Sequence, residues 1–177
     1  MKVKKTRFKG LLIVKQINNT DKRGNLRETF NKKLLDKNFV FEYCTTSKNN
    51  VLRGFHFQYK FKQSKYVNVL KGKILDVVID LRKNSKTFGK LFSIILSKDN
   101  ALGLYIPAGF AHAYYSYDKE NIIYYKLDNF YAPKFESGIV YNDPIIKVKW
   151  PKKNFLVSKK DKKLLTFDAF CKKFGGI

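Results

Sequence analysis

The sequence predicts an all-β sandwich or barrel, and three observations support this fold class. Hydrophobic residues make up 44% of the 177 residues and aromatic residues 16%, which suits a sizeable core and excludes a disordered or collagen-like chain. β-Branched and aromatic residues recur with a period of two in short runs separated by Gly, Asn, Asp and Lys. Helical patterns do not intervene between these runs, so a sandwich or barrel is favoured over a parallel α/β sheet. The length fits one domain, residues 1–177.

Each predicted strand is a short run of alternating or continuous apolar residues. Residues 51–58 form a strand-like run that contains a histidine. Lys71-Gly72 suits a tight hairpin turn between two neighbouring strands. The other strands are expected over residues 11–14, 66–70, 73–81, 91–96, 102–106, 111–117 and 122–127.

Helical patterns are confined to two flanking segments. A weak pattern covers residues 30–37. A stronger one covers residues 161–174, where apolar residues recur at steps of three and four, and Gly175 and Gly176 would end it. We expect this second helix to pack on the β-structure by one face.

The charge of the chain suggests an anionic partner, but its distribution does not. The 37 basic and 14 acidic residues give a net charge of +23. The basic residues are spread along the whole chain, and lysine far outnumbers arginine, whose planar fork is favoured for reading bases and clamping phosphates. We therefore expect most lysines to form a solvated surface, with no nucleic-acid partner and no membrane partner. The densest cluster, at residues 159–163, is an anion patch or a charged turn.

The compartment expected from the sequence is the cytoplasm. The two cysteines, Cys44 and Cys171, lie far apart, and no apolar signal-peptide core follows the basic start. No apolar run approaches the roughly 20 residues that a membrane helix requires.

Only two histidines, His56 and His112, are available for chemistry near neutral pH. Arg53 and His56 would point to opposite faces of a regular strand, but a bulge at Gly54 would bring both to one face. The pair would then offer an anion clamp and a titratable base; the alternative is a buried structural histidine beside a surface arginine. The same two readings apply to His112, which follows a turn at residues 107–109.

A series of short motifs, in order along most of the chain, resembles one known family. The motifs are Asp21-Lys22-Arg23-Gly24 with Glu28, residues 53–58, Gln63-Ser64-Lys65, residues 76–82, 85–90 and 96–97, residues 107–112, Tyr124-Tyr125-Lys126, Tyr131-Ala132-Pro133 with Glu136, residues 141–144, Trp150-Pro151 and residues 158–161. Together they are similar to the dTDP-4-dehydrorhamnose 3,5-epimerase family.

The resemblance implies a cupin-like jelly-roll β-sandwich or barrel with short peripheral helices, and a metal-independent isomerase without a cofactor. Members of the family invert C3 and C5, the carbons flanking the keto group of a nucleotide-linked 4-keto-6-deoxy sugar, in the biosynthesis of sugars for surface polysaccharides such as lipopolysaccharide and capsule. By position, His56 matches the base and Asp161 the carboxylate that orients it. Tyr125 matches the acid on the opposite face, and Lys65 the cation beside the enolate oxygen.

The resemblance also implies which residues bind the substrate. Members of the family are homodimers whose N-terminal strands cross to the partner, so Arg23 and Glu28 are expected to serve the neighbouring site. The predicted substrate-binding residues are Arg23, Glu28 and Lys160 for the nucleotide diphosphate and base, Tyr131 for stacking on the base, Arg53 and His112 for the sugar and phosphate, and Glu136.

One departure from the family pattern leaves the substrate open. The family has a Gln-x-Asn-x-Ser pattern before the arginine–glycine motif, whereas this chain has Phe41-Glu42-Tyr43-Cys44-Thr45. The nucleotide can therefore be thymidine or another, for instance guanosine diphosphate carrying a 4-keto heptose. Inversion of both carbons or of C3 alone also remains open.

Three further alternatives differ in class. A metal-dependent cupin needs several histidines, but Gln58 stands where a second one would follow His56. The same absence argues against a 3,4-ketoisomerase. A non-catalytic module that binds sugar or nucleic acid is the third alternative, and the joint presence of His56, Asp161 and Tyr125 argues against a sugar-binding one.

Overall fold

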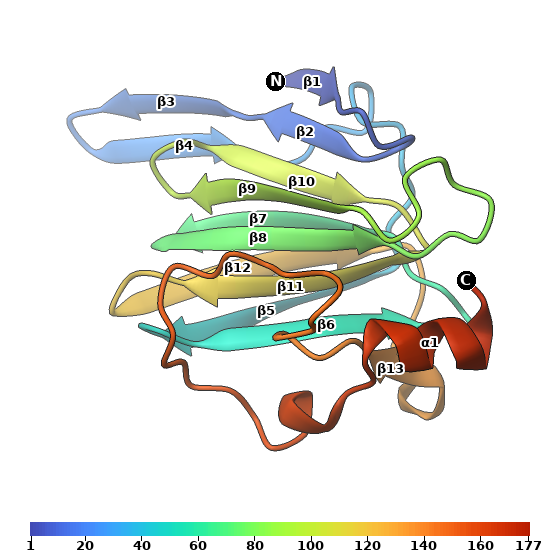
Figure 1. The fold of residues 1–177 in the computed structure, drawn as a ribbon. Helices are drawn as coiled ribbons and strands as arrows, with labels where there is room; N and C mark the ends of the chain where they lie inside the picture. Colours follow the sequence, from blue (N-terminus) through green and yellow to red (C-terminus); the bar gives the residue numbers. More distant parts are fainter.

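The computed structural model describes residues 1–177, and most of its strands form two facing sheets (Figure 1). In spatial order, the six-stranded sheet comprises β1 (Lys2–Lys5), β2 (Leu12–Lys15), β10 (Leu102–Ile106), β7 (Lys65–Lys71), β12 (Glu120–Leu127) and β5 (Phe41–Lys48). The five-stranded sheet comprises β13 (Glu136–Gly138), β6 (Leu52–Gln58), β11 (Phe110–Ser116), β8 (Lys73–Asp80) and β9 (Leu91–Ser97). Neighbouring strands are antiparallel, so the all-β prediction is confirmed.

The remaining elements lie outside the two sheets. A separate hairpin consists of β3 (Ile17–Asp21) and β4 (Gly24–Glu28), and extends at one end of the sandwich (Figure 1). Two 3₁₀ turns cover Pro133–Phe135 and Asp161–Lys163. The helix α1 (Phe167–Phe174) follows them near the C-terminus. No helix is long and apolar enough to span a bilayer.

The predicted hairpin at Lys71-Gly72 is wrong. The strands on either side of it, β7 and β8, belong to different sheets, so this short connection crosses from one layer to the other. Gly72 has a φ of +79°, and a Cβ there would stand 2.6 Å from the Glu120 carbonyl oxygen. Because β7 and β8 both carry strongly apolar faces, packing those faces across the core replaces pairing within one sheet.

The predicted helix at residues 30–37 is also wrong. Asn31 makes a single turn instead: its carbonyl accepts from the amides of Leu34 and Leu35, and its Oδ1 accepts from the amide of Lys33. Phe30 and Leu35 belong to a small apolar cluster on the outer face of the six-stranded sheet. Tertiary burial of these two side chains overrides a weak helical pattern.

The predicted C-terminal helix is shorter than expected. Leu165 pairs with Ile139 in an extended bridge, which interrupts the segment after the 3₁₀ turn. The α-helix begins after Thr166, whose side chain caps it by accepting from the Ala169 amide, and ends at Gly175 with a φ of +61°. Phe170 buries the apolar face of α1 against the outer side of the five-stranded sheet.

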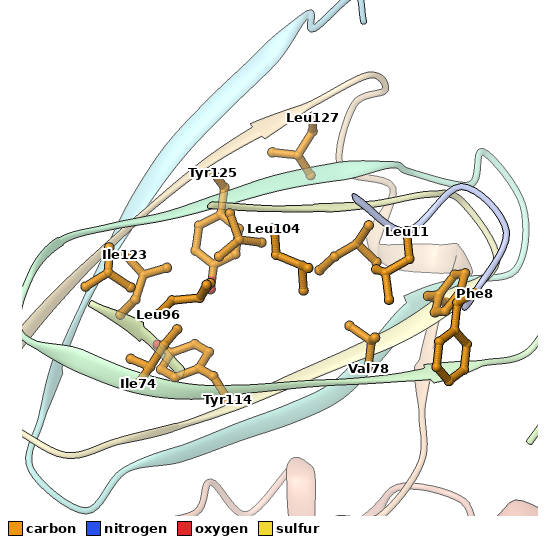
Figure 2. Close-up of a cluster of buried hydrophobic side chains, with 14 residues drawn as sticks. Phe8, Leu11, Ile74, Val78, Leu96, Leu104, Tyr114, Ile123, Tyr125 and Leu127 are labelled. Carbon is orange, nitrogen blue, oxygen red and sulfur yellow. The ribbon is translucent and has the colours of Figure 1, made fainter. Parts of the chain in front are cut away.

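The main core lies between the two sheets (Figure 2). Alternate residues point into it from both layers, as the period of two requires. Full burial of one such large side chain stabilises the fold by roughly 1.5–3 kcal/mol. At one end of this interior the apolar residues give way to polar side chains, and those side chains form the candidate site.

Candidate active site

A β-bulge in β6 places Arg53 and His56 on the same, inward face. His56 pairs with His112, and Arg53 pairs with Tyr114, so two residues of β6 lie opposite one residue of β11. Since His112 and Tyr114 are two apart on a strand, they share a face, and so do their partners. Gly54 at the bulge has a φ of +114°, and a Cβ there would stand 2.5 Å from the His112 carbonyl oxygen. The predicted bulge is confirmed.

His56, which is partly exposed, pairs with the buried Asp161, although 105 residues separate them. The His56 Nε2 lies 2.8 Å from Asp161 Oδ1, and the Gly54 amide donates to Oδ2 over 3.1 Å. Burial alone would raise the pKa of Asp161, but the hydrogen bonds from His56, Gly54 and Ser158 together lower it. An ionised carboxylate only accepts, so Nε2 carries a hydrogen and Nδ1 of a neutral imidazole is left as the free base.

A cavity of about 240 Å³ opens beside this pair. His56 and Lys65 lie in its wall, on strands of opposite sheets. Burial lowers the pKa of the Lys65 ammonium, and the charges of Glu136 and Asp76 partly offset this effect. The lining residues are Phe41, Tyr43, His56, Phe57, Gln58, Gln63, Lys65, Tyr131 and Glu136.

Glu136, Tyr131 and Lys160 form a polar cluster at the rim of the cavity. Glu136 accepts from the Tyr131 hydroxyl over 2.9 Å and forms an ion pair with Lys160. Burial acts to raise the pKa of Glu136, but the bonds from Lys160 and Tyr131 and the nearby His56 lower it overall. Tyr131 remains 51% exposed, so its ring can receive a flat ligand.

Tyr125 lies behind the cavity wall, on the inward face of β12. Its ring stacks on that of Tyr43, with centroids 4.8 Å apart, and only 4% of the residue is exposed. Burial, reinforced by Tyr114, Tyr43 and Asp76, raises the pKa of Tyr125 well above its ordinary value. Tyr124, the adjacent residue, instead bonds to Glu42 and points to the other face of the sheet.

His112 is buried in the same interior and is fixed by a second carboxylate. Its Nε2 lies 2.8 Å from Asp76 Oδ2, and its ring centroid is 6.1 Å from that of Tyr125. Asp76 is completely buried, and its other oxygen, Oδ1, has no hydrogen-bond partner.

Arg23 and Glu28 are not brought to this cavity by their own chain. Both lie on the β3–β4 hairpin, where Arg23 pairs with Asp21 and Glu28 accepts from Asn31. Arg53 lies on the inward side of β6 and donates through Nε to Ser47 Oγ over 3.2 Å. The structure thus gathers nine of the eleven predicted site residues around one interior: His56, Tyr125, Asp161, Lys65, Arg53, His112, Tyr131, Glu136 and Lys160.

Four polar residues of the site were not predicted as functional, and two of them lie at positions that a local sequence pattern could have indicated. Asp76 is a charge at an inward position of the apolar strand β8, and such a residue must be paired when buried. Tyr43 alternates with Phe41 and Thr45 along β5, so the three side chains share one face of the strand. Because polar and apolar residues occur on both faces of β5, the sequence did not show which face points inward. Gln58 and Gln63 belong to motifs that carry the family resemblance, but no local pattern assigned either of them a functional role. No group of three or more His, Cys, Asp or Glu side chains is arranged to hold a metal ion.

Comparisons of the whole chain with known proteins identify its family. The sequence model of a family described as dTDP-4-dehydrorhamnose 3,5-epimerase matches residues 5–169. The enzyme of that name from Methanothermobacter thermautotrophicus is 39% identical over 166 residues, covering 89% of this chain and 90% of its own.

Solved structures of similar proteins share the fold. The dTDP-4-dehydrorhamnose 3,5-epimerase of Bacillus anthracis, with TDP and PPi bound, has a TM-score of 0.90 at 35% identity and covers 93% of this chain and 98% of that one. A dTDP-6-deoxy-D-glucose-3,5-epimerase from Legionella pneumophila, in complex with dTDP-4-keto-L-rhamnose, has a TM-score of 0.89 at 34% identity, with coverages of 94% and 92%. The sandwich is therefore the cupin-like fold that the resemblance implied, and the chain is an isomerase that belongs to the dTDP-4-dehydrorhamnose 3,5-epimerase family.

Proposed function

We propose that this enzyme inverts C3 and C5 of a dTDP-linked 4-keto-6-deoxy sugar, with His56 as base and Tyr125 as acid. The observation that carries the proposal is the His56–Asp161 pair, which faces a cavity that also holds the Lys65 ammonium. The dTDP-4-keto-L-rhamnose bound to the Legionella protein and the TDP bound to the Bacillus protein support the nucleotide and the sugar class.

The geometry suits proton abstraction beside a ketone. Nδ1 of His56 takes the proton from the carbon, and the C–H bonding electrons move to the ketone oxygen to form an enolate. The Lys65 ammonium stabilises that oxygen in a site with little water, where a fixed charge acts strongly. Tyr125 then gives its proton to the opposite face of the carbon, which inverts the centre and leaves a phenolate.

The roles of the binding residues follow from their places around the cavity. Tyr131, at the rim, is suited to stack on the base, and Lys160 and Arg53 are suited to meet the diphosphate. His112, held by Asp76, lines the sugar end of the interior. We further propose that the product supplies sugars for surface polysaccharides and that the enzyme works in the cytoplasm as one domain.

The proposal is tested by incubation in deuterated water with dTDP-4-keto-6-deoxyglucose, followed by NMR. We expect deuterium at both C3 and C5, with inversion at each. Deuterium at C3 alone would identify a single-centre epimerase, and activity only with a guanosine-linked 4-keto heptose would change the assigned substrate. No exchange with any of these sugars would contradict the enzymatic function.

Tyr125→Phe is expected to separate exchange from inversion. Without the phenol proton, His56 still removes the substrate proton, exchanges it with the deuterated solvent and returns a deuteron to the same face. Inversion should therefore fall about 10²-fold or more while exchange continues. Tyr124→Phe is the matched control, because its hydroxyl points to the other face of β12. Equal effects of the two substitutions on inversion would contradict the role of Tyr125.

We propose that the enzyme is a homodimer in which the β3–β4 hairpin crosses to the partner and brings Arg23 and Glu28 to its site. The exposed hairpin, which carries both residues away from their own cavity, supports this arrangement. Arg23→Ala and His56→Asn homodimers should each be impaired. Heterodimers of the two variants should regain activity, since one of their two sites has both His56 and the partner's intact arginine. A strictly monomeric active enzyme, or no recovery in heterodimers, would contradict the exchange.

A further inference from the structure

Gln58, the last residue of β6, lines the cavity and bonds to two loops at once. It is buried and stands two residues beyond His56. Its Nε2 donates to the Phe61 carbonyl over 2.7 Å and to the Phe130 carbonyl over 3.4 Å. Its Oε1 accepts from the Ala132 amide over 2.8 Å. One side chain therefore ties the loop that follows β6 to the loop that follows β12.

The partners of the Gln58 amide fix its orientation and occupy both of its hydrogens. A backbone N–H can only donate and a carbonyl can only accept, so Oε1 faces Ala132 and Nε2 faces Phe61. The second hydrogen of Nε2 has the Phe130 carbonyl as its acceptor. Gln58 thus has no donor left for a ligand, although it lines the cavity, and its bonds hold the protein itself.

Two of the three backbone groups bonded to Gln58 flank Tyr131. The Phe130 carbonyl belongs to the peptide group before Tyr131, and the Ala132 amide to the one after it. At the other end of the side chain, the Tyr131 hydroxyl donates to Glu136 over 2.9 Å. Glu136 lies directly opposite Gln58 in the pairing of β13 with β6. One pair of facing strand residues therefore holds Tyr131 by its backbone and by its hydroxyl.

We propose that Gln58 is a positioning residue for nucleotide binding, which sets the Tyr131 ring at the rim of the cavity so that the base can stack on it. Because Tyr131 is half exposed, packing against the protein does little to fix its ring. The bonds at its two ends hold the ring before the nucleotide arrives, and this reduces the ordering cost of binding. The inference rests on the proposed role of Tyr131 in stacking on the base.

The test measures the affinity of the intact enzyme for TDP by calorimetry. Tyr131→Ala removes the stacking ring and should raise the Kd for TDP about 5- to 100-fold. Gln58→Met keeps the unbranched shape without hydrogen bonds and should raise it about 5-fold or more, within the same range. KM for the dTDP-linked sugar should rise with it at unchanged kcat, because stacking on the base contributes equally to the ground and transition states.

Gln58→Glu is a second variant of the same length. Its carboxylate keeps the acceptor for the Ala132 amide, but it turns an oxygen towards the carbonyls of Phe61 and Phe130. Affinity for TDP should therefore fall in this variant as well. Wild-type affinity in both Gln58→Glu and Gln58→Met would refute the positioning role.

Asn100→Leu is the matched control. The Asn100 amide also makes three bonds to the backbone, in the turn between β9 and β10: its Oδ1 accepts from the amides of Ser97 and Leu102, and its Nδ2 donates to the Ile95 carbonyl. Both substitutions remove such a clamp and should lower the free energy of unfolding, but only Gln58→Met should weaken TDP binding. An equal loss of TDP affinity in the two variants would show a general structural effect and overturn the inference.

A double variant separates this inference from the proposed role of Tyr131. If Gln58 acts through Tyr131, adding Gln58→Met to Tyr131→Ala should change the Kd for TDP by less than about twofold. A further loss as large as that in the single variant would overturn the inference alone. Unchanged TDP affinity in Tyr131→Ala would overturn the proposed stacking, and the positioning role of Gln58 with it.

Discussion

Replacement of His56 by asparagine is expected to abolish deuterium exchange at both C3 and C5. His56 is the one imidazole in the cavity wall, and its Nδ1 is the free base of the His56–Asp161 pair. General-base catalysis contributes about 10²–10⁴-fold, so kcat should fall by a factor in that range. NMR of the sugar in deuterated water measures exchange and inversion in the same sample.

Asp161→Asn is the graded control for this prediction. The amide keeps the size of the side chain but no longer provides the ionised acceptor that fixes Nε2–H, so activity should fall less than in His56→Asn.

The hydrogen bonds that lower the pKa of Asp161 also stabilise the folded enzyme. That stabilisation is present above the ordinary aspartate pKa and is lost as the pH falls through the lowered one. Full exchange activity in His56→Asn would disprove the base assignment.

The strands could be predicted from the sequence because their apolar period is local. The predicted strand over residues 102–106 matches β10 without change, and that over 91–96 matches β9 to within one residue. The pairing of β7 with β10 and β12 could not be predicted, since the Lys71-Gly72 connection reads as a hairpin yet joins two layers. The β3–β4 hairpin was missed because its residues are polar and exposed, without a buried face to set a period.

The candidate site could be predicted in part for the same reason. Gly54 indicated the bulge that turns Arg53 and His56 to one face, because only a local backbone feature was needed. The pairing of His56 with Asp161 came from the family resemblance rather than from any local pattern, since it depends on the C-terminal segment returning to β6. Tyr43 was noted only as a departure from that pattern, and its stacking on Tyr125 depends on the register of β5 against β12.

Lys65→Met is expected to lower activity and to raise stability at the same time. Under the role proposed for Lys65, removing its positive charge should reduce kcat by about 10²–10³-fold, as loss of one oxyanion-stabilising group does. Methionine has a similar unbranched shape without a charge to desolvate, so the free energy of unfolding should rise by about 0.5–2 kcal/mol. Kinetics and chemical denaturation of the same preparation measure both effects. A loss of stability in Lys65→Met would contradict the expectation that burying the charge of Lys65 destabilises the wild-type fold.

The destabilisation caused by burying the charge of Lys65 should depend on pH, and the direction of this dependence follows from the lowered pKa. Burial holds the pKa of Lys65 below 10.5, so between the folded and unfolded values the unfolded chain binds more protons. Wild-type stability should therefore increase with pH across this window and approach that of Lys65→Met.

The lowered pKa of Lys65 also predicts a loss of activity at alkaline pH. The pKa values of Tyr43 and Tyr125 are raised above the ordinary tyrosine value and that of Glu136 is lowered below the ordinary glutamate value. Among these neighbours, only Lys65 therefore accounts for an alkaline loss of activity below pH 10.5. In Lys65→Arg, whose guanidinium stays charged, this loss should disappear; its persistence would assign the limb to another group.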